Sequence, residues 1–376
     1  MKKLINIILL IFFIMLFLSQ IYYPVSGDFP NYYNNEPLRT TPKIKWELKL
    51  CEDDLYATLA GDYIVVASEH GKLFVIEWKK GKIIWELEKI CDFPGYPVIS
   101  DNIIYLCNLL NDIYAVELLS GKILWKSTKK PSRFEDEPTI IGDYVYVFGD
   151  SKSSITMINK KNGEIVNYIY LGDYWVMTIN VINNFIYLVL CSKNYEYKML
   201  IIDPKDLSII KDNIKFEDMS CLYYINNLII YKNGFKRSDG KYYMNFYILD
   251  ENFNSKEIYS TSDGSLTNIF DSFTTDGKYI YQTSYQHVYC ISIEEKKLIW
   301  NKYLNDIDPS PVAICKDIGY FSDDGGDNLY GIELNKGEIL WSIKLGSRFY
   351  GLDSIPIPLD NAIIVYTTAG RIALLK

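Results

Sequence analysis

The densest group of side chains capable of chemistry lies between residues 322 and 328, where the sequence reads Ser-Asp-Asp-Gly-Gly-Asp-Asn. Its three carboxylates, Asp323, Asp324 and Asp327, are oxygen ligands of the kind that hold a hard cation such as Ca²⁺. A solvated hairpin turn explains the same residue types, because Asp, Asn and Gly are the usual turn formers. The turn is the simpler interpretation, so the sequence predicts no metal site.

The rest of the chain offers little that could support catalysis. Two histidines, His70 and His287, fall near turns of different segments, too few for a His-rich zinc site or a recognisable Ser-His-Asp triad. The sequence has no Walker loop and no GxSxG motif, and its seven cysteines include no CxxC. Most of the cysteines lie in apolar, strand-like segments, as buried thiols do, while a disulfide between Cys51 and Cys91 is an open alternative for that pair. We expect no catalytic residue and no cofactor.

The elements that carry these residues recur along the chain. The clearest copy of the repeated pattern runs from Ala115 through Glu117 and Gly121 to Trp125, and another copy ends at Trp341. The last position of the pattern falls on residues 46, 85, 125, 167, 211, 258, 300 and 341. A period of about forty residues, carried by short strand-like segments, is typical of a β-propeller array.

Each period divides into four short strands. In the second copy, residues 113–118 alternate as a half-buried strand would, and Gly121 then supplies the positive φ that the following turn needs. In the fifth copy, Asn254 takes the place of that glycine. Large flat side chains on the last strand fill the wedge between neighbouring blades, which predicts five blade-docking residues: Trp46, Trp85, Trp125, Trp300 and Trp341.

The two ends of the chain complete each other. Residues 370–376 match the third strand of a repeat, and residues 43–48 match a fourth strand with no preceding three. Joining them leaves no open edge in the ring. We therefore predict an all-β fold, an eight-bladed β-propeller of four-stranded antiparallel blades over residues 43–376, closed by pairing of the N-terminal and C-terminal strands. Because the fourth and fifth copies are degenerate, seven blades is the alternative.

The N-terminal residues predict export. Lys2 and Lys3 precede an unbroken apolar stretch over residues 4–18, which fits a signal peptide in residues 1–27 with cleavage after Gly27. Extended to Tyr23, the same stretch fits a retained membrane anchor over residues 4–23. Both alternatives place the remainder outside the cytoplasm, secreted or in the cell envelope. Residues 28–42, rich in Asn, Tyr and Pro, indicate a linker.

The charge balance excludes one class of partner. The net charge is −8, and no run of Lys or Arg provides the basic footprint of a nucleic-acid-binding protein. We expect a monomer that contacts a membrane only through its N-terminal segment.

The repeated pattern resembles the Ala-x-Asp-x-x-x-Gly-Lys-x-x-Trp repeat of the pyrroloquinoline-quinone (PQQ)-like propellers, over essentially all of Lys43–Lys376. In architecture the chain is similar to exported scaffolds of the BamB kind. The resemblance implies a fold more than an activity, because the superfamily contains enzymes, sensors and scaffolds. Its alcohol dehydrogenases carry a pair of adjacent cysteines and a calcium-binding Glu, Asn and Asp. This chain has no adjacent cysteines, and that calcium set cannot be placed on it.

A binding face is predicted from the loops. Connections from fourth to first strands, and from second to third strands, are expected to be longer than the others and to emerge on one end of the ring, where binding residues concentrate. The following residues of these loops are of the types that anchor interfaces: Arg133, Phe134, Tyr174, Trp175, Arg348, Phe349 and Tyr350. Capping of the blade ends explains the same aromatic residues equally well. The predicted function is a non-enzymatic scaffold that binds a protein or a surface polymer; carbohydrate or small-ligand binding at the channel mouth is the alternative, and a PQQ-dependent oxidoreductase is less favoured.

Overall fold

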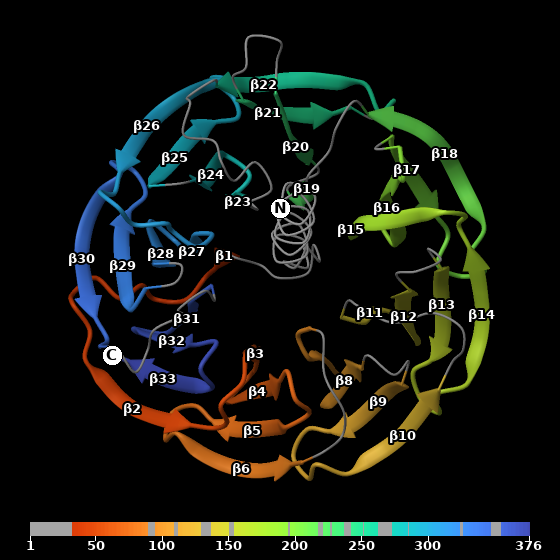
Figure 1. Ribbon diagram of the computed structural model, residues 1–376, viewed down its shortest axis with the longest axis horizontal. Helices are drawn as coiled ribbons and strands as arrows, with labels where there is room; N and C mark the ends of the chain where they lie inside the picture. The colour runs from red at the N-terminus through yellow and green to blue at the C-terminus, as the bar shows by residue number, and fades with distance from the viewer. Residues whose placement is uncertain are drawn as a thin grey trace, which may run out of the picture.

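The computed structural model describes residues 32–88, 95–108, 112–128, 137–149, 154–194, 196–216, 221–225, 228–236, 242–250, 252–261, 273–284, 286–323, 326–346 and 355–376. In these ranges the regular structure consists of β-strands, arranged as eight sheets around a ring axis (Figure 1). We call the sheets blades 1 to 8. In each blade the first strand lies nearest the axis and the fourth lies at the outer rim (Figure 1).

Blades 1 to 4 follow one another along the chain. Blade 1 contains β3 (Leu55–Ala60), β4 (Tyr63–Ser68), β5 (Leu73–Glu77) and β6 (Lys82–Leu87). Blade 2 contains β7 (Val98–Ser100), β8 (Ile103–Cys107), β9 (Asp112–Glu117) and β10 (Ile123–Thr128). Blade 3 contains β11 (Thr139–Ile141), β12 (Tyr144–Gly149), β13 (Ser154–Asn159) and β14 (Ile165–Tyr170). Blade 4 contains β15 (Tyr174–Ile182), β16 (Phe185–Ser192), β17 (Tyr197–Ile202) and β18 (Ile209–Phe216).

Blades 5 to 8 complete the ring. Blade 5 contains β19 (Cys221–Ile225), β20 (Leu228–Lys236), β21 (Tyr242–Leu249) and β22 (Ser255–Thr261). Blade 6 contains β23 (Phe273–Thr275), β24 (Tyr279–Ser284), β25 (His287–Ser292) and β26 (Lys297–Tyr303). Blade 7 contains β27 (Ala313–Cys315), β28 (Ile318–Ser322), β29 (Asn328–Glu333) and β30 (Glu338–Lys344), and β1 (Tyr32–Tyr33) joins its inner edge. Blade 8 contains β31 (Ile357–Leu359), β32 (Ala362–Tyr366), β33 (Arg371–Leu375) and, as its outer strand, β2 (Ile44–Lys49).

The predicted closure is confirmed, and the seven-blade alternative is wrong. Strand β2 pairs antiparallel with β33, with Trp46 opposite Leu374 and Lys49 opposite Arg371. Beyond the paired strands, the N–H of Lys43 donates to the Lys376 carbonyl and the N–H of Lys376 donates to the Lys43 carbonyl, both at 2.9 Å. Strands from the two ends of the chain therefore form one blade.

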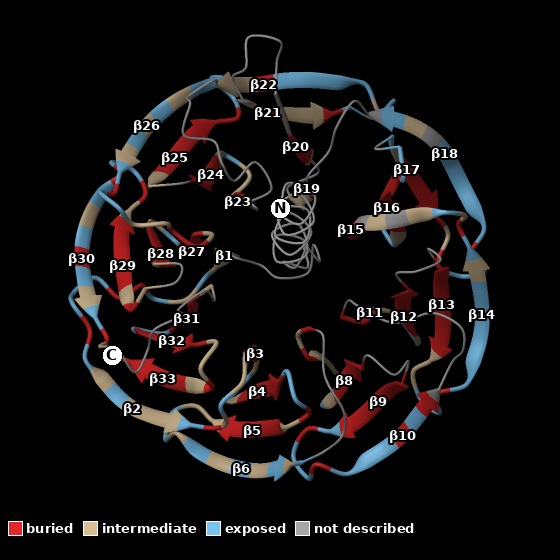
Figure 2. Cartoon of the chain, viewed as in Figure 1, coloured by how far each residue is buried: buried red, intermediate tan, exposed pale blue. Residues whose placement is uncertain are grey.

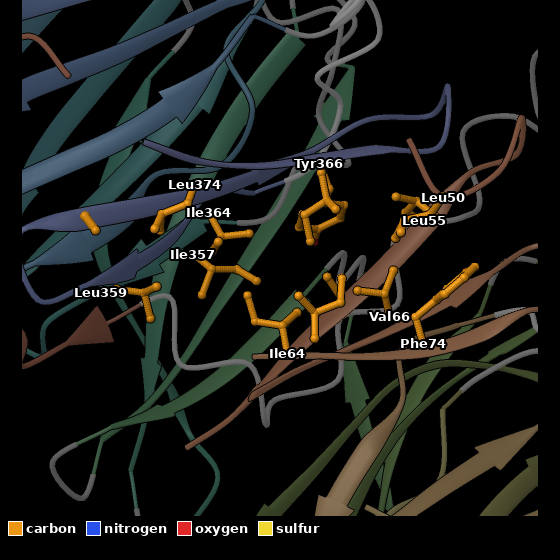
Figure 3. Close-up of a cluster of buried hydrophobic side chains, with 14 residues drawn as sticks. Leu50, Leu55, Ile64, Val66, Phe74, Ile357, Leu359, Ile364, Tyr366 and Leu374 are labelled. Atoms are coloured by element: carbon orange, nitrogen blue, oxygen red, sulfur yellow. The ribbon is translucent and has the colours of Figure 1, made fainter. Parts of the chain in front are cut away.

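The core is divided into clusters between neighbouring blades. At the closure, Ile357, Ile364 and Leu374 of blade 8 face Ile64 and Val66 of blade 1 (Figure 3). Second and third strands are covered on both sides, so they are almost continuously apolar and buried, whereas the outer strands are mostly exposed or half-buried (Figure 2). The half-buried strand predicted over residues 113–118 is therefore wrong, because β9 has both faces against neighbouring blades.

Five tryptophans, in blades 1, 2, 6, 7 and 8, lie against the next blade. The Trp46 indole N–H donates to the Trp78 carbonyl at 2.7 Å, and the Trp125 indole N–H donates to the Lys160 carbonyl at 3.0 Å. Trp85 and Trp300 make the same bond to Leu118 and Leu334 of the next blade. In all four cases the acceptor carbonyl belongs to the turn that joins the third and fourth strands of the next blade, three residues before the glycine of that turn. The indole ring packs against this glycine.

A register shift recurs in every outer strand, one residue before the docking position. Such a bulge turns the docking side chain towards the next blade and blunts the sheet edge. In blade 5 the shift falls at Ile258, so the register places Tyr259 where the pattern predicts Ile258. The positive φ of the preceding turn also falls on Phe253 rather than on Asn254, which corrects the sequence interpretation of that turn.

The described part of the predicted linker packs against the propeller. Strand β1 runs parallel to β27, with Tyr33 opposite Cys315. The chain then crosses between blades 7 and 8, where the N–H of Leu38 donates to the Tyr320 hydroxyl at 2.6 Å and the Leu38 carbonyl accepts from the Trp341 indole at 3.2 Å. The Arg39 guanidinium forms two hydrogen bonds with Asp317, at 2.8 and 3.0 Å. We call residues 32–39 the strap.

Candidate functional site

Loop length distinguishes one end of the ring, although in a narrower way than the sequence predicts. Four connections from a fourth strand to the next first strand span ten residues or more, over residues 88–97, 129–138, 262–272 and 345–356, and a fifth, over residues 304–312, spans nine. Connections from second to third strands are about as short as those from third to fourth strands, as 69–72 and 78–81 show in blade 1. The prediction of a second class of long loops is therefore wrong. The four long connections define the long-loop face.

Most of the predicted interface residues lie outside the described residues. These are Arg133, Phe134, Arg348, Phe349 and Tyr350. Trp175 belongs to β15, but the position of its side chain is not described. Tyr174 begins the same strand, half-buried, with the Lys198 ammonium 3.9 Å from the centre of its ring. Tyr174 is therefore a partly exposed aromatic residue at the end of the ring where the sequence places it.

A cluster of tyrosines lies at the inner end of the long-loop face. Tyr96, at the end of the connection 88–97, reaches across blade 1, so that its hydroxyl lies 3.4 Å from that of Tyr366 in blade 8. The Tyr56 ring of blade 1 packs edge-on against Tyr96, with ring centres 5.4 Å apart. We call Tyr56, Tyr96 and Tyr366 the tyrosine cluster. It brings three blades together where their strands begin or end beside the ring axis.

The electrostatics of the cluster keep its hydroxyls protonated. Burial, followed by the charges of Asp54 and Glu69, raises the pKa of Tyr56 to about 12. Burial also raises the pKa of Tyr96, and the carboxylate of Glu137 adds to this shift. A phenol with a raised pKa is a poor base and a poor nucleophile at neutral pH, but it stacks and exchanges hydrogen bonds. The arrangement is suited to binding.

Tyr56 and Tyr366 are difficult to identify as site residues from the sequence. Both occupy strand positions that look like ordinary core, the second residue of β3 and the last residue of β32. Only the positions of Tyr56 and Tyr366 within their strands indicate a shared location, because the start of a first strand and the end of a second strand both lie on the long-loop face.

The acidic turn at residues 322–328 behaves as a hairpin in its described part. The Gly326 N–H donates to the Asp323 carbonyl at 2.8 Å, and the Asn328 side chain donates to the Asp323 carboxylate at 3.1 Å. Asp327 lies 3.6 Å from the Lys344 ammonium, and Asp324 lies outside the described residues. Across the described residues, no three His, Cys, Asp or Glu side chains gather as a metal site requires.

The remaining titratable residues have local roles. His70 lies 3.1 Å from the Asp53 carboxylate and His287 bonds Asn301 at 2.8 Å, in blades 1 and 6. In the described part of the chain, Cys51, Cys290 and Cys315 form no disulfide. Burial raises the pKa of the Cys290 thiol to about 12 and that of Cys315 to about 11, so both are inert thiols. Cys91, the other half of the disulfide considered above, lies outside the described residues.

The opposite face has a hollow at the closure between blades 8 and 1. This cavity of about 510 Å³ is lined by Lys45, Trp78, Asp360 and Lys376, among others. The Trp78 indole donates to the Gly61 carbonyl at 3.0 Å. The hollow arises because the outer two strands of blade 8 come from different ends of the chain, so no turn covers the space beside them.

Comparisons with known proteins agree with the architecture. A family model described as outer membrane protein assembly factor BamB matches residues 39–170. The repeat unit and the closed ring are those of the PQQ-like β-propeller superfamily, as predicted. No curated protein matches the chain.

Solved structures with the same fold differ widely in what they are. BamB from Moraxella catarrhalis is 12% identical, with a TM-score of 0.65, covering 90% of this chain and 98% of its own. A europium-containing methanol dehydrogenase is 10% identical, with a TM-score of 0.67, covering 92% and 96%. The computationally designed Ika8 protein is 11% identical, with a TM-score of 0.65, covering 87% and 98%. At such identities the likeness shows the fold alone.

The described residues beside the ring axis show no match to the quinone site that the resemblance implies for the dehydrogenase branch. The adjacent cysteines that the resemblance implies are absent from the sequence. The tyrosine cluster offers hydroxyl groups and the nearby Glu137, which is not the donor set of a calcium-bound quinone. In the described part of the chain, no helix has the length and apolar character needed to cross a membrane; the predicted anchor over residues 4–23 lies outside that part.

Proposed function

We propose that this protein is an exported, non-enzymatic propeller scaffold that binds a protein or a surface polymer through its long-loop face. The observation that carries the proposal is the concentration of long connections on one end of a rigid ring, with the tyrosine cluster at its inner end. Rigid scaffolds commonly carry binding residues on such loops. The family match over residues 39–170, described as an assembly factor, supports a binding role in the cell envelope.

The test compares the two faces of the ring. The full chain would be exported by its host, crosslinked in place and recovered with its partners, alongside Phe134→Ala and Phe349→Ala. Trp78→Leu, on the opposite face, is the matched aromatic control. We expect the two loop variants to lose the partner that the parent protein and Trp78→Leu retain. If both loop variants stay folded and keep every partner, the long-loop face is not the binding surface.

The tyrosine cluster also favours a second function, saccharide binding at the channel mouth. Tyrosine rings stack on sugar faces while their hydroxyls exchange hydrogen bonds with sugar hydroxyls. Calorimetric titration with oligosaccharides from the host envelope would test this function. Tyr96→Phe, which keeps the ring and removes the hydroxyl, should weaken binding roughly tenfold, as expected for the loss of one buried hydrogen bond. Dye reduction with added PQQ and calcium tests the oxidoreductase alternative.

A further inference from the structure

The outer strand of blade 3 has a composition that the other outer strands avoid. Strand β14 reads Ile-Val-Asn-Tyr-Ile-Tyr and contains no charged residue. The other seven outer strands contain at least one charged residue each. Charges on edge strands prevent sheets of different molecules from joining. Blade 3 therefore lacks a protection that the rest of the rim retains.

This uncharged strand is also widely exposed (Figure 2). Ile165 and Val166 are 41% and 50% exposed, and Tyr168 and Tyr170 are 62% and 52% exposed. The bulge residue of blade 7, Leu340, is 40% exposed but lies on a strand that begins with Glu338 and ends with Lys344. Exposed apolar residues also lie on the outer strands of the two flanking blades: Ile123, Leu124, Ile209 and Ile210. We call β14 and these four residues the rim patch.

The edge of blade 3 is held in place by its own contacts. Asn167 stands where five other blades have a docking tryptophan, and its side-chain amide donates to the Asp206 carbonyl of blade 4 at 2.8 Å. The same side chain accepts the N–H of Tyr168 at 2.8 Å. A surface fixed in this way has little conformational entropy left to lose when a partner binds.

We propose that the rim patch is the docking surface for a second copy of this chain, related by a two-fold axis through β14. The net charge of −8 makes copies repel each other, so self-association favours β14, the outer strand that itself carries no charged residue, even though Asp173 beside it accepts a 2.8 Å hydrogen bond from Tyr170. In a two-fold contact the same patch meets itself. Tyr168 and Tyr170 then face their own symmetry mates, and aromatic pairs favour such contacts. The proposal replaces the monomer expected from the sequence.

The expected affinity follows from the size of the patch. Taking ~200 Å² for a tyrosine side chain, Tyr168 and Tyr170 expose roughly 100–130 Å² each. With their apolar neighbours they approach the ~800 Å² that one partner contributes to a standard interface. Because the rim is convex, two rings cover only part of this surface. We therefore expect a dimer with a dissociation constant on the order of micromolar.

Sedimentation of the full chain from about 1 to about 200 µM tests the proposal. The parent protein should shift from monomer to dimer over this range, and Tyr168→Lys should weaken dimerisation at least tenfold, because two ammonium groups would meet at the axis. Leu340→Lys adds the same charge to the rim of blade 7 and should leave the dimer unchanged. A parent chain that stays monomeric throughout overturns the proposal, as does equal loss in the two variants.

A covalent readout separates this contact from association through the apolar N-terminal segment. Tyr168→Cys places a thiol near the two-fold axis and should form a disulfide-linked dimer on mild oxidation. Leu340→Cys should remain monomeric under the same conditions, apart from the background of the parent cysteines. Equal crosslinking of the two variants would show that copies associate without the rim patch.

Discussion

The contact between a docking tryptophan and the next blade's turn can be tested at one glycine with an internal control. Gly163 has φ +74°, and a Cβ added there would lie 2.6 Å from Cε3 of the Trp125 ring. Gly142 has φ +58° in another turn of the same blade, with nothing within 4 Å of an added Cβ. The two glycines therefore share a conformation but differ in their surroundings.

The expected destabilisation of each variant follows from two effects, the backbone strain at a positive φ and the overlap of the new methyl group with the indole. Alanine in the left-handed region is disfavoured by ~1–2 kcal/mol, and both variants incur this strain. Only Gly163→Ala also forces a methyl group into the buried indole, and overpacking of this kind destabilises by ~1–3 kcal/mol. Gly142→Ala should therefore lower the free energy of unfolding by ~1–2 kcal/mol, and Gly163→Ala by ~2–5 kcal/mol.

Urea unfolding of both variants measures the difference, provided that the m-value stays unchanged. Repeating the measurement in a Trp125→Leu background removes the ring that the new methyl group would meet. In that background Gly163→Ala should lose its extra ~1–3 kcal/mol and match Gly142→Ala, as expected for directly contacting residues. Equal effects of the two glycine variants in the parent chain would refute the idea that the indole shapes the turn.

Three further predictions concern the strap and the buried thiols. Tyr320→Phe leaves the buried N–H of Leu38 without its acceptor at 2.6 Å, so it should lower the free energy of unfolding by ~1–3 kcal/mol. It should also speed proteolysis within residues 32–42, and unchanged proteolysis would contradict this. In the folded chain the thiols of Cys290 and Cys315 have pKa values of about 12 and about 11, above the ordinary cysteine value of 9.0. Between these values the folded chain keeps protons that the unfolded chain releases. Stability should therefore fall as pH rises from about 9 to about 12, and a flat urea midpoint over that range would contradict the burial argument. At pH 8 an alkylating reagent should modify half-buried Cys51 before Cys290, as peptide mapping can show.

The sequence predicts the ring well because its repeat combines two local requirements. A glycine such as Gly121 has a positive φ and lies against Trp85, so that it and the indole recur at fixed spacings. The pattern contains no sign of the bulge, however, and in blade 5 both the docking position and the turn shift by one residue. A degenerate copy can be counted from its period, but its register depends on packing against its neighbours.

The candidate site is harder to predict because it depends on contacts between distant residues. Tyr96 and Tyr366 lie 270 residues apart and meet only because the ring closes. Neither has a neighbour in the sequence that marks it as more than a strand or loop residue. The loops themselves are recognisable by length, which locates the long-loop face without identifying the side chains that form its inner end.

Ring closure also explains why the strap contacts the propeller. Four tryptophans donate to a carbonyl in the turn that joins the third and fourth strands of the next blade. Blade 8 has no such turn, because its outer strand comes from the other end of the chain. Trp341 would face that gap with an unsatisfied, buried N–H. The Leu38 carbonyl fills the role of the missing turn. Residues that connect the ring to its N-terminal segment thus also complete its last interface, so strap and ring should unfold together.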